Sequence, residues 1–222
     1  MQSDVQRTEA PYVPALGFAA LTRLYDPVLR ATLREDVFKR ALVAQAAATS
    51  GSRVLDLGAG TGTLTMLLQR AAPGATVVGV DGDPDILALA RRKASAAELV
   101  LRFDHGMADA LPYDDGSFDR VVSSLLFHHL TPAVKRRALA EAHRVLAPGG
   151  ELHVADWGRP QNALMRVLFV GIQLLDGFAT TAENVDGMLP DLFREAGFHD
   201  VRETRAFATV FGTIALYRGR RP

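Results

Sequence analysis

The stretch "VLDLGAGTG", residues 54–62, is an apolar run that ends in an acid and then places three glycines among its last five residues. Glycine after a strand lets a ligand approach the backbone, and a helix that follows offers N–H groups with no partner inside the helix. A tight turn without a ligand is the alternative. The stretch therefore predicts a strand, a glycine-rich turn and a helix, with Asp56 in the strand.

Short β-rich runs alternate with Ala- and Leu-rich stretches of helical spacing along most of the chain. The runs are "RVLDL" (53–57), "TVVGV" (76–80), "LVLRF" (99–103), "DRVVSSLL" (119–126) and "ELHVADW" (151–157). This order predicts an α/β fold, doubly wound, with helices on both faces of a parallel sheet. Residues 201–207 and 209–220 alternate like a closing hairpin. No repeat or linker divides the chain, so we expect residues 1–222 to form a single domain.

Helix boundaries carry their own signals. Asp26–Pro27, Asp83–Pro84 and Thr131–Pro132 each pair an N-cap residue with a proline suited to the first helical position. "APGG" at 147–150 is expected to stop the helix that begins after Thr131 and to lead into the fifth strand. Residues 182–198 predict one further helix.

Composition excludes several classes of site. The chain has 222 residues, and its 25 basic residues balance 25 acidic ones, so no net field favours nucleic acid or an anionic membrane. The absence of cysteine excludes disulfides and thiolate sites. The first residues lack the apolar core of a secretory signal, and no apolar run is long enough to span a bilayer. The expected location is cytoplasmic.

The second strand adds evidence on the ligand. It ends in Asp81, at the distance along the chain where an acid reaches the two hydroxyls of a ribose. The glycine spacing is Gly58-x-Gly60-x-Gly62, whereas the dinucleotide fingerprint would need glycine at position 63, which is Thr63. The pattern thus favours an adenosine-containing cofactor other than a nicotinamide dinucleotide.

Four segments in this order resemble the class I S-adenosylmethionine-dependent methyltransferases. They are "VLDLGAGTG", "VVGVDGDPDIL", "GMADALPYDDGSFDRVVSSLLFHHL" and "RVLAPGGELHVADW". The last two look most like the small-molecule branch that includes the ubiquinone and menaquinone C-methyltransferases. The resemblance implies a Rossmann-like seven-stranded sheet of order 3-2-1-4-5-7-6 whose last strand is antiparallel.

The resemblance also implies a set of residues around S-adenosylmethionine and its product S-adenosylhomocysteine. Asp56 would orient the loop, Asp81 would hold the ribose hydroxyls, and Ile86 would pack on the adenine. Gly82 departs from the family, which usually has a larger apolar side chain against the adenine there. The remaining implied contacts are Gly58, Gly60 and Thr61 at the methionine part, Asp109 with the backbone of Ala110 at the adenine amino group, and Ser124 near the methionine end.

A sulfonium methyl group needs little activation, so placing the acceptor and excluding water are the main tasks of such a site. His128 and His129 follow the fourth strand, and either could take a proton from a phenol, an enol or an ammonium group. Packing at the base of the next helix is the alternative for both. The histidines have no metal-ligand spacing, and no metal is expected.

Two segments could define the acceptor pocket. Residues 1–48 are placed as an N-terminal helical cover, with Tyr25 as a pocket residue or a packing residue. Residues 159–182 form an inserted apolar segment, which would be a substrate cover containing Phe169, a core helix or the interface of a homodimer. A cover would favour a small, apolar or aromatic acceptor, methylated at carbon or oxygen.

Two other functions fit parts of the pattern. The chain could bind the cofactor without turnover, as a regulatory or interaction protein, because the acceptor site is not readable from the sequence. A nicotinamide-dependent oxidoreductase is disfavoured by Thr63. "SSLLFHHL" differs from the Asn-Pro-Pro-Tyr motif of DNA amine methylation, and with the balanced charge this favours a small-molecule acceptor over nucleic acid.

Overall fold

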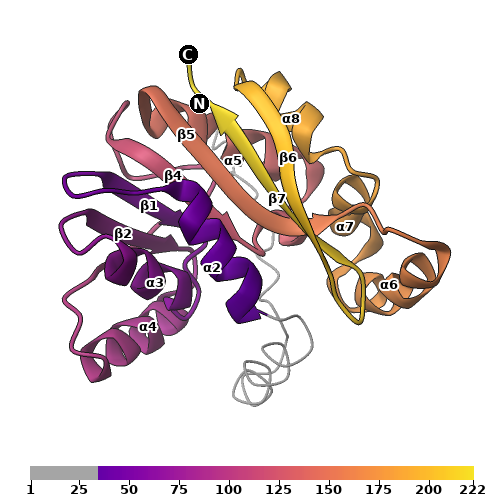
Figure 1. The fold of residues 1–222 in the computed structure, drawn as a ribbon, viewed down its shortest axis with the longest axis horizontal. Coiled ribbons are helices and arrows are strands. Elements are labelled where there is room, and N and C mark those ends of the chain that lie inside the picture. Colours follow the sequence, from indigo (N-terminus) through magenta and orange to yellow (C-terminus); the bar gives the residue numbers. More distant parts are fainter. Residues whose placement is uncertain (1–34) are drawn as a thin grey trace, which may run out of the picture.

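Seven strands form one sheet in the computed structural model, which describes residues 35–222 (Figure 1). The order is β3-β2-β1-β4-β5-β7-β6, the first five strands are parallel, and β7 runs antiparallel to both β5 and β6. This confirms the predicted order and the antiparallel last strand. The bounds are β1 Arg53–Leu57, β2 Thr76–Asp81, β3 Arg102–His105, β4 Phe118–Ser124, β5 Leu146–Gly158, β6 His199–Ala208 and β7 Thr213–Arg220.

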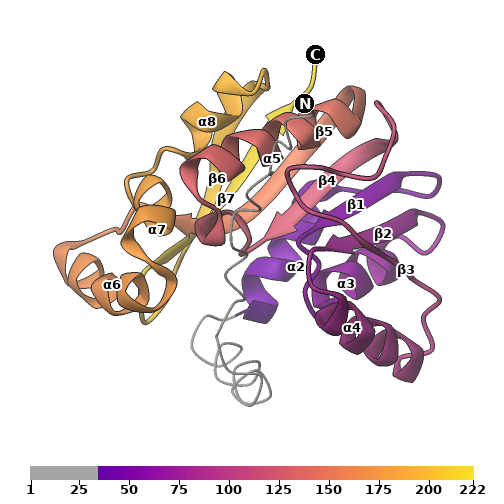
Figure 2. The same cartoon turned by 180° about the vertical axis from the view of Figure 1, so that it is seen from behind.

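Helices cover both faces of the sheet. In Figure 1 α2 and α3 lie over one face, and the opposite view in Figure 2 shows α5 and α8 over the other. The helices α6 and α7 extend beyond the sheet near the turn between β6 and β7. The bounds are α2 Glu35–Ala46, α3 Thr63–Ala71, α4 Pro84–Ala96, a short 3-10 helix η1 Phe127–His129, α5 Pro132–Val145, α6 Ala163–Asp176, α7 Phe178–Val185 and α8 Leu189–Glu195.

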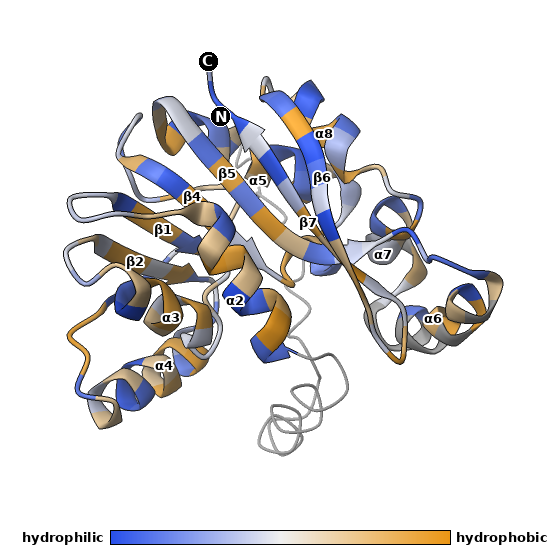
Figure 3. Ribbon diagram, viewed as in Figure 1, coloured by the Kyte–Doolittle hydropathy of each residue, from blue (hydrophilic) through white to orange (hydrophobic). Residues whose placement is uncertain are grey.

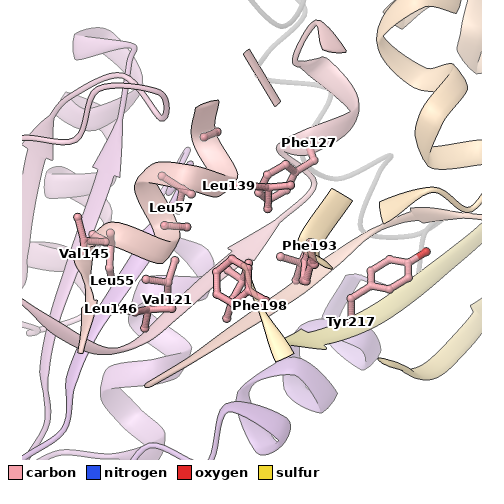
Figure 4. Close-up of a cluster of buried hydrophobic side chains, with 14 of the residues drawn as sticks. Leu55, Leu57, Val121, Phe127, Leu139, Val145, Leu146, Phe193, Phe198 and Tyr217 are labelled. Carbon is pink, nitrogen blue, oxygen red and sulfur yellow. The ribbon is translucent and has the colours of Figure 1, made fainter. Parts of the chain in front are cut away.

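Alternating side chains of the central strands divide the core into two clusters. Leu55 joins the cluster under α5 and α8, while Val54 joins the cluster under α2 and α3. Figure 4 shows the first cluster, in which Leu139 and Phe193 bring α5 and α8 onto the strands. Figure 3 shows the apolar character of β1 and β2 and the polar character of β6, as expected for central strands and an edge strand.

The described part of the N-terminal segment, α2, belongs to this core. Phe38, Leu42 and Ala46 of α2 are fully buried against the sheet. Of the predicted cover 1–48, residues 35–46 are therefore a packed helix. Tyr25 and the helix start at Asp26–Pro27 lie outside the described residues.

Two predicted elements differ from the structure. The third strand covers residues 102–105 and not 99–103, and Val100 before it is fully exposed. β3 is an edge strand that pairs with β2 alone, so a short run of residues is enough to form it. The single helix predicted over 182–198 is two helices, α7 and α8. Gly187 adopts a φ of +75° between them, and Pro190 lies in the first turn of α8.

Among residues 35–222, no helix combines the length and the apolar character that crossing a membrane requires.

Candidate active site

Three polar residues lie near the carboxyl ends of β1, β2 and β4. β1 pairs with β2 on one side and with β4 on the other, so the strand order changes direction beside β1. Doubly wound sheets bind their ligands at the carboxyl ends of the strands at such a switch point. Asp56 lies in β1, Asp81 ends β2 and Ser124 ends β4. The sheet thus brings together three of the residues that the sequence pattern singled out.

Asp81 holds the glycine-rich turn in place. Its Oδ2 accepts a hydrogen bond from Gly60 N at 2.8 Å, and its Oδ1 accepts one from Asp83 N at 3.0 Å. Burial raises the pKa of Asp81, and the two N–H groups oppose that rise. Gly60 has a φ of +53°, and a Cβ there would meet no atom within 4 Å, so glycine at this position serves the backbone conformation and leaves open space.

Asp56 is buried and incompletely hydrogen-bonded. Its Oδ2 accepts from Thr65 Oγ1 at 2.6 Å, whereas its Oδ1 has no hydrogen-bond partner among the described residues. Burial raises the pKa of Asp56 to about 6, despite the Thr65 bond. The Oγ of Ser124 is likewise buried and without a partner in residues 35–222. Unsatisfied buried oxygens are costly, so these two atoms are available to polar groups of a ligand.

The start of α3 and both ends of α4 complete this side of the site. Lys93 of α4 donates from Nζ to Thr61 Oγ1 at 3.2 Å and to Thr63 Oγ1 at 2.6 Å, so the Thr61 hydroxyl is tied to the helix. Asp83 caps α4, as expected, by accepting from Asp85 N and Ile86 N. Ile86 is only partly buried. The next residue, Leu87, is fully buried, whereas Ile86 keeps a partly accessible side chain.

Two predicted adenine contacts have other partners. Oδ2 of Asp109 accepts from Nε and Nη2 of Arg137 at 3.1 and 2.7 Å, which ties this carboxylate to α5. Ala110 N donates to Met107 O at 3.0 Å. A contact from Ala110 N to an adenine would have to compete with its bond to Met107 O, whereas the Asp109 carboxylate has further lone pairs with which it can accept.

An imidazole and a carboxylate pair at the ends of β4 and β5. Nδ1 of His128 lies 2.8 Å from Oδ1 of Asp156, and both side chains are buried. Asp156 also accepts from Phe127 N and Trp157 N. Burial opposes the ionisation of Asp156, but His128 and the Trp157 N–H outweigh it and lower the pKa of Asp156. A carboxylate only accepts, so His128 donates from Nδ1 and its basic nitrogen is Nε2.

His129 differs from its neighbour. Its ring lies 3.9 Å from the ring of His128, centroid to centroid. Burial, with the charge of His128, lowers the pKa of His129 to about 3. An imidazole with so low a pKa is a weak proton acceptor near neutral pH. Of the two histidines in the predicted pair, His128 is therefore the better base.

The strained end of β4 directs the histidines. Leu125 has a φ of +58°, which is uncommon for a non-glycine residue, and its N–H donates to Ala155 O at 2.8 Å. The following 3-10 helix carries Phe127, His128 and His129. Asp156 was not predicted as a site residue, although it is an acid near the end of an apolar strand, as Asp56 and Asp81 are.

Phe169 is a core residue in the structure. It is 1% exposed, and its ring makes an edge-to-face contact with Trp157 at 5.0 Å. Gly212, in the turn between β6 and β7, also lies against this ring. Phe169 thus attaches α6 to β5 and to this turn. The predicted acceptor contact of Phe169 would require this packing to open.

Within residues 35–222, no group of three or more His, Asp or Glu side chains is arranged to hold a metal ion.

Comparison with known proteins identifies close relatives. Residues 54–150 match a family described as a methyltransferase domain. The chain is 37% identical over 203 residues to the demethylmenaquinone methyltransferase of Thermus thermophilus, covering 83% of this chain and 90% of that protein. It is 32% identical over 242 residues to the demethylmenaquinone methyltransferase of Clavibacter sepedonicus, covering 100% of this chain and 95% of the relative. Phosphoethanolamine N-methyltransferase 2 of Haemonchus contortus, solved with S-adenosyl-L-methionine, shares the fold, with a TM-score of 0.68 at 16% identity over 83% of this chain and 52% of that one.

Proposed function

Since this chain belongs to the class I S-adenosylmethionine-dependent methyltransferases and acts on a small molecule, we propose that its acceptor is a hydroxylated aromatic of the reduced naphthoquinone type, methylated at a ring carbon. The observation that carries this proposal is the buried His128–Asp156 pair, at 2.8 Å, because a phenol needs a proton acceptor whereas the methyl donor needs none. Relatives named as demethylmenaquinone methyltransferases support the choice of acceptor.

The residues at the ends of β1, β2 and β4 fit the cofactor. Asp56 Oδ1 and Ser124 Oγ are buried without partners, and we assign them to the polar groups of its methionine part, the ammonium facing Asp56. Asp81 would accept from the ribose hydroxyls through the remaining lone pairs of its carboxylate, and Ile86 would pack on the adenine. Further contacts at the methionine part are assigned to the turn residues Gly58, Gly60 and Thr61.

Bound S-adenosylmethionine supplies a methyl group on a positively charged sulfur, ready for in-line displacement. In the proposed reaction His128 Nε2 takes the proton of the acceptor hydroxyl, which raises the electron density of the ring and of the carbon that bonds to the methyl group. The carbon that has received the methyl group then loses its own proton to solvent, and His128 returns the hydroxyl proton to the oxygen as the ring regains aromaticity. Asp156 keeps His128 in the Nδ1–H form and stabilises the imidazolium. Burial of both residues keeps water from the reacting atoms.

The acceptor proposal predicts transfer of labelled methyl from S-adenosylmethionine to demethylmenaquinol or a short-chain analogue kept reduced. We expect the oxidised quinone to be inactive, because it has no hydroxyl proton for His128 to take. Mass spectrometry with NMR of the product gives the methylated atom. A methyl ether as the product would assign the reaction to oxygen, and an absence of transfer to any reduced naphthoquinone would reject this acceptor class.

Asp81→Ala is expected to weaken S-adenosylhomocysteine binding by about one to two decades in Kd, because a charged acceptor of hydrogen bonds is lost. Isothermal calorimetry measures this, with NAD as a ligand that neither protein binds. Asp83→Ala is the matched control. It removes the cap of α4 at a cost of about 1 kcal/mol in stability and leaves affinity near that of the parent. Equal affinities of Asp81→Ala and the parent protein would place the ribose elsewhere.

A further inference from the structure

The space beside Gly82 is occupied by a side chain from the loop after the neighbouring strand. A Cβ built on Gly82 would lie 2.9 Å from Met107 Sδ and 3.6 Å from its Cε. The φ of Gly82 lies outside the left-handed region, so its backbone would accept other residues. What glycine provides at position 82 is therefore room for Met107.

Hydrogen bonds between the two loops fix this arrangement. Gly106 N donates to Asp81 O at 3.0 Å, and His105 Nε2 lies 3.1 Å from Gly82 O. Ala110 N donates to Met107 O and closes the turn that carries the methionine. Despite this fixed backbone, Met107 is 42% exposed. An exposed apolar side chain on a hydrogen-bonded turn beside the acid of β2 is suited to contact with a ligand.

Resting on the proposed function, we infer that Met107 is the wall against which the adenine ring of the cofactor packs. A ribose held by Asp81 places its base next to the residues that follow Asp81 along the crevice. Gly82 offers no side chain there, and Met107 fills the adjoining space from the next loop. A thioether is polarisable and makes favourable contacts with aromatic rings. Ile86, which is partly buried on α4, would line the same subsite.

The contact between the two positions means that residues 82 and 107 act as a pair. A branched side chain at 82 pushes the flexible end of Met107 out of this space, whereas with a smaller residue at 107 the new side chain itself supplies the wall. The effects of the two changes should therefore be strongly non-additive. If residue 107 acted through a hydrogen bond instead, a larger side chain at 82 would not restore the affinity lost by a change at 107.

The test uses calorimetry with S-adenosylhomocysteine and S-inosylhomocysteine, in which an oxygen replaces the adenine amino group. Met107→Ala is expected to raise the Kd for S-adenosylhomocysteine by about two- to tenfold, and Met107→Leu by less than about twofold. The factor for Met107→Ala should be the same with S-inosylhomocysteine, since a ring-face contact does not use the amino group. Gly82→Val should weaken binding at least as much as Met107→Ala, and the double variant should return to within about threefold of the parent protein.

The test separates a failure of the proposed cofactor site from a failure of the inference about Met107. If the parent protein binds neither ligand, the proposed cofactor site is wrong. If it binds S-adenosylhomocysteine but Met107→Ala binds equally well, or if the losses of the two single variants add in the double variant, the inference about Met107 is overturned while the proposed function stands. Thermal melting checks folding, and if Gly82→Val does not fold, the comparison of Met107→Ala with Met107→Leu decides.

Discussion

Asp156→Asn is expected to lower kcat for methyl transfer by about 10²- to 10⁴-fold, the contribution of a positioned general base and of the group that orients it. Asparagine keeps an oxygen for one backbone N–H, but its neutral amide neither stabilises an imidazolium nor enforces the Nδ1–H form of His128. Cofactor affinity should remain within about threefold, because Asp156 touches His128 and backbone N–H groups of η1 and β5. Single-turnover kinetics with labelled S-adenosylmethionine separates the two effects.

The variants of the neighbouring histidines test the same assignment. His128→Gln should lose as much kcat as Asp156→Asn, and the double variant should lose little more, since the pair acts as a unit. His129→Gln is the matched control and should cost much less, because burial lowers the pKa of His129 to about 3. A larger loss for His129→Gln than for His128→Gln would assign the base to His129.

Asp56→Asn is expected to change stability and cofactor binding in opposite directions. The folded pKa of Asp56, about 6, lies above the ordinary value of 3.8 for an unfolded chain. The stability that this raised pKa confers is fully present below about pH 4 and is lost as pH rises through 6, which amounts to about 3 kcal/mol. Asparagine does not titrate. In ligand-free protein the variant should therefore exceed the parent in free energy of unfolding by an amount that grows to about 3 kcal/mol above pH 7.

The same substitution removes the carboxylate that we assign to the cofactor's ammonium. We expect a loss of about one to two decades in S-adenosylhomocysteine affinity at pH 7.5. The affinity of the parent protein should fall below pH 6, and that of the variant should not. Urea denaturation at pH 4 to 8 and calorimetry measure both quantities.

Asp119→Asn is a control in which the expected change in stability is opposite to that of Asp56→Asn. Hydrogen bonds from Arg53, against a smaller effect of burial, lower the pKa of Asp119. Its contribution to stability is thus present above the unfolded pKa and lost as pH falls, so the variant should be less stable than the parent near neutral pH. Cofactor affinity should be unchanged. An Asp56→Asn protein that is less stable than the parent at pH 8 would contradict the assignment of a buried carboxylate with a raised pKa.

Local features of the sequence determined most of the fold. The alternation of apolar strands with helical stretches, the glycines after "VLDL" and the caps at Asp83–Pro84 act through neighbouring residues, so they can be recognised without the structure. The same is true of Asp56 and Asp81, which stand near the ends of two successive parallel strands and so share one edge of the sheet. The exact ends of β3 were missed because an edge strand is paired on one side only, and the break between α7 and α8 was missed although Gly187 and Pro190 signal it locally.

Only the tertiary structure decided which side chains pair across the site. His128 meets Asp156 because β4 and β5 are adjacent, with Ser124 opposite Ala155, and this register places residues 28 positions apart within 2.8 Å. Met107 reaches Gly82 because the loops after β2 and β3 are joined by hydrogen bonds. Phe169 is a core residue because α6 turns its face to Trp157. Side-chain pairing depends on the register of strands and on the packing angle of helices, and neither is encoded in the spacing of residues along a single segment.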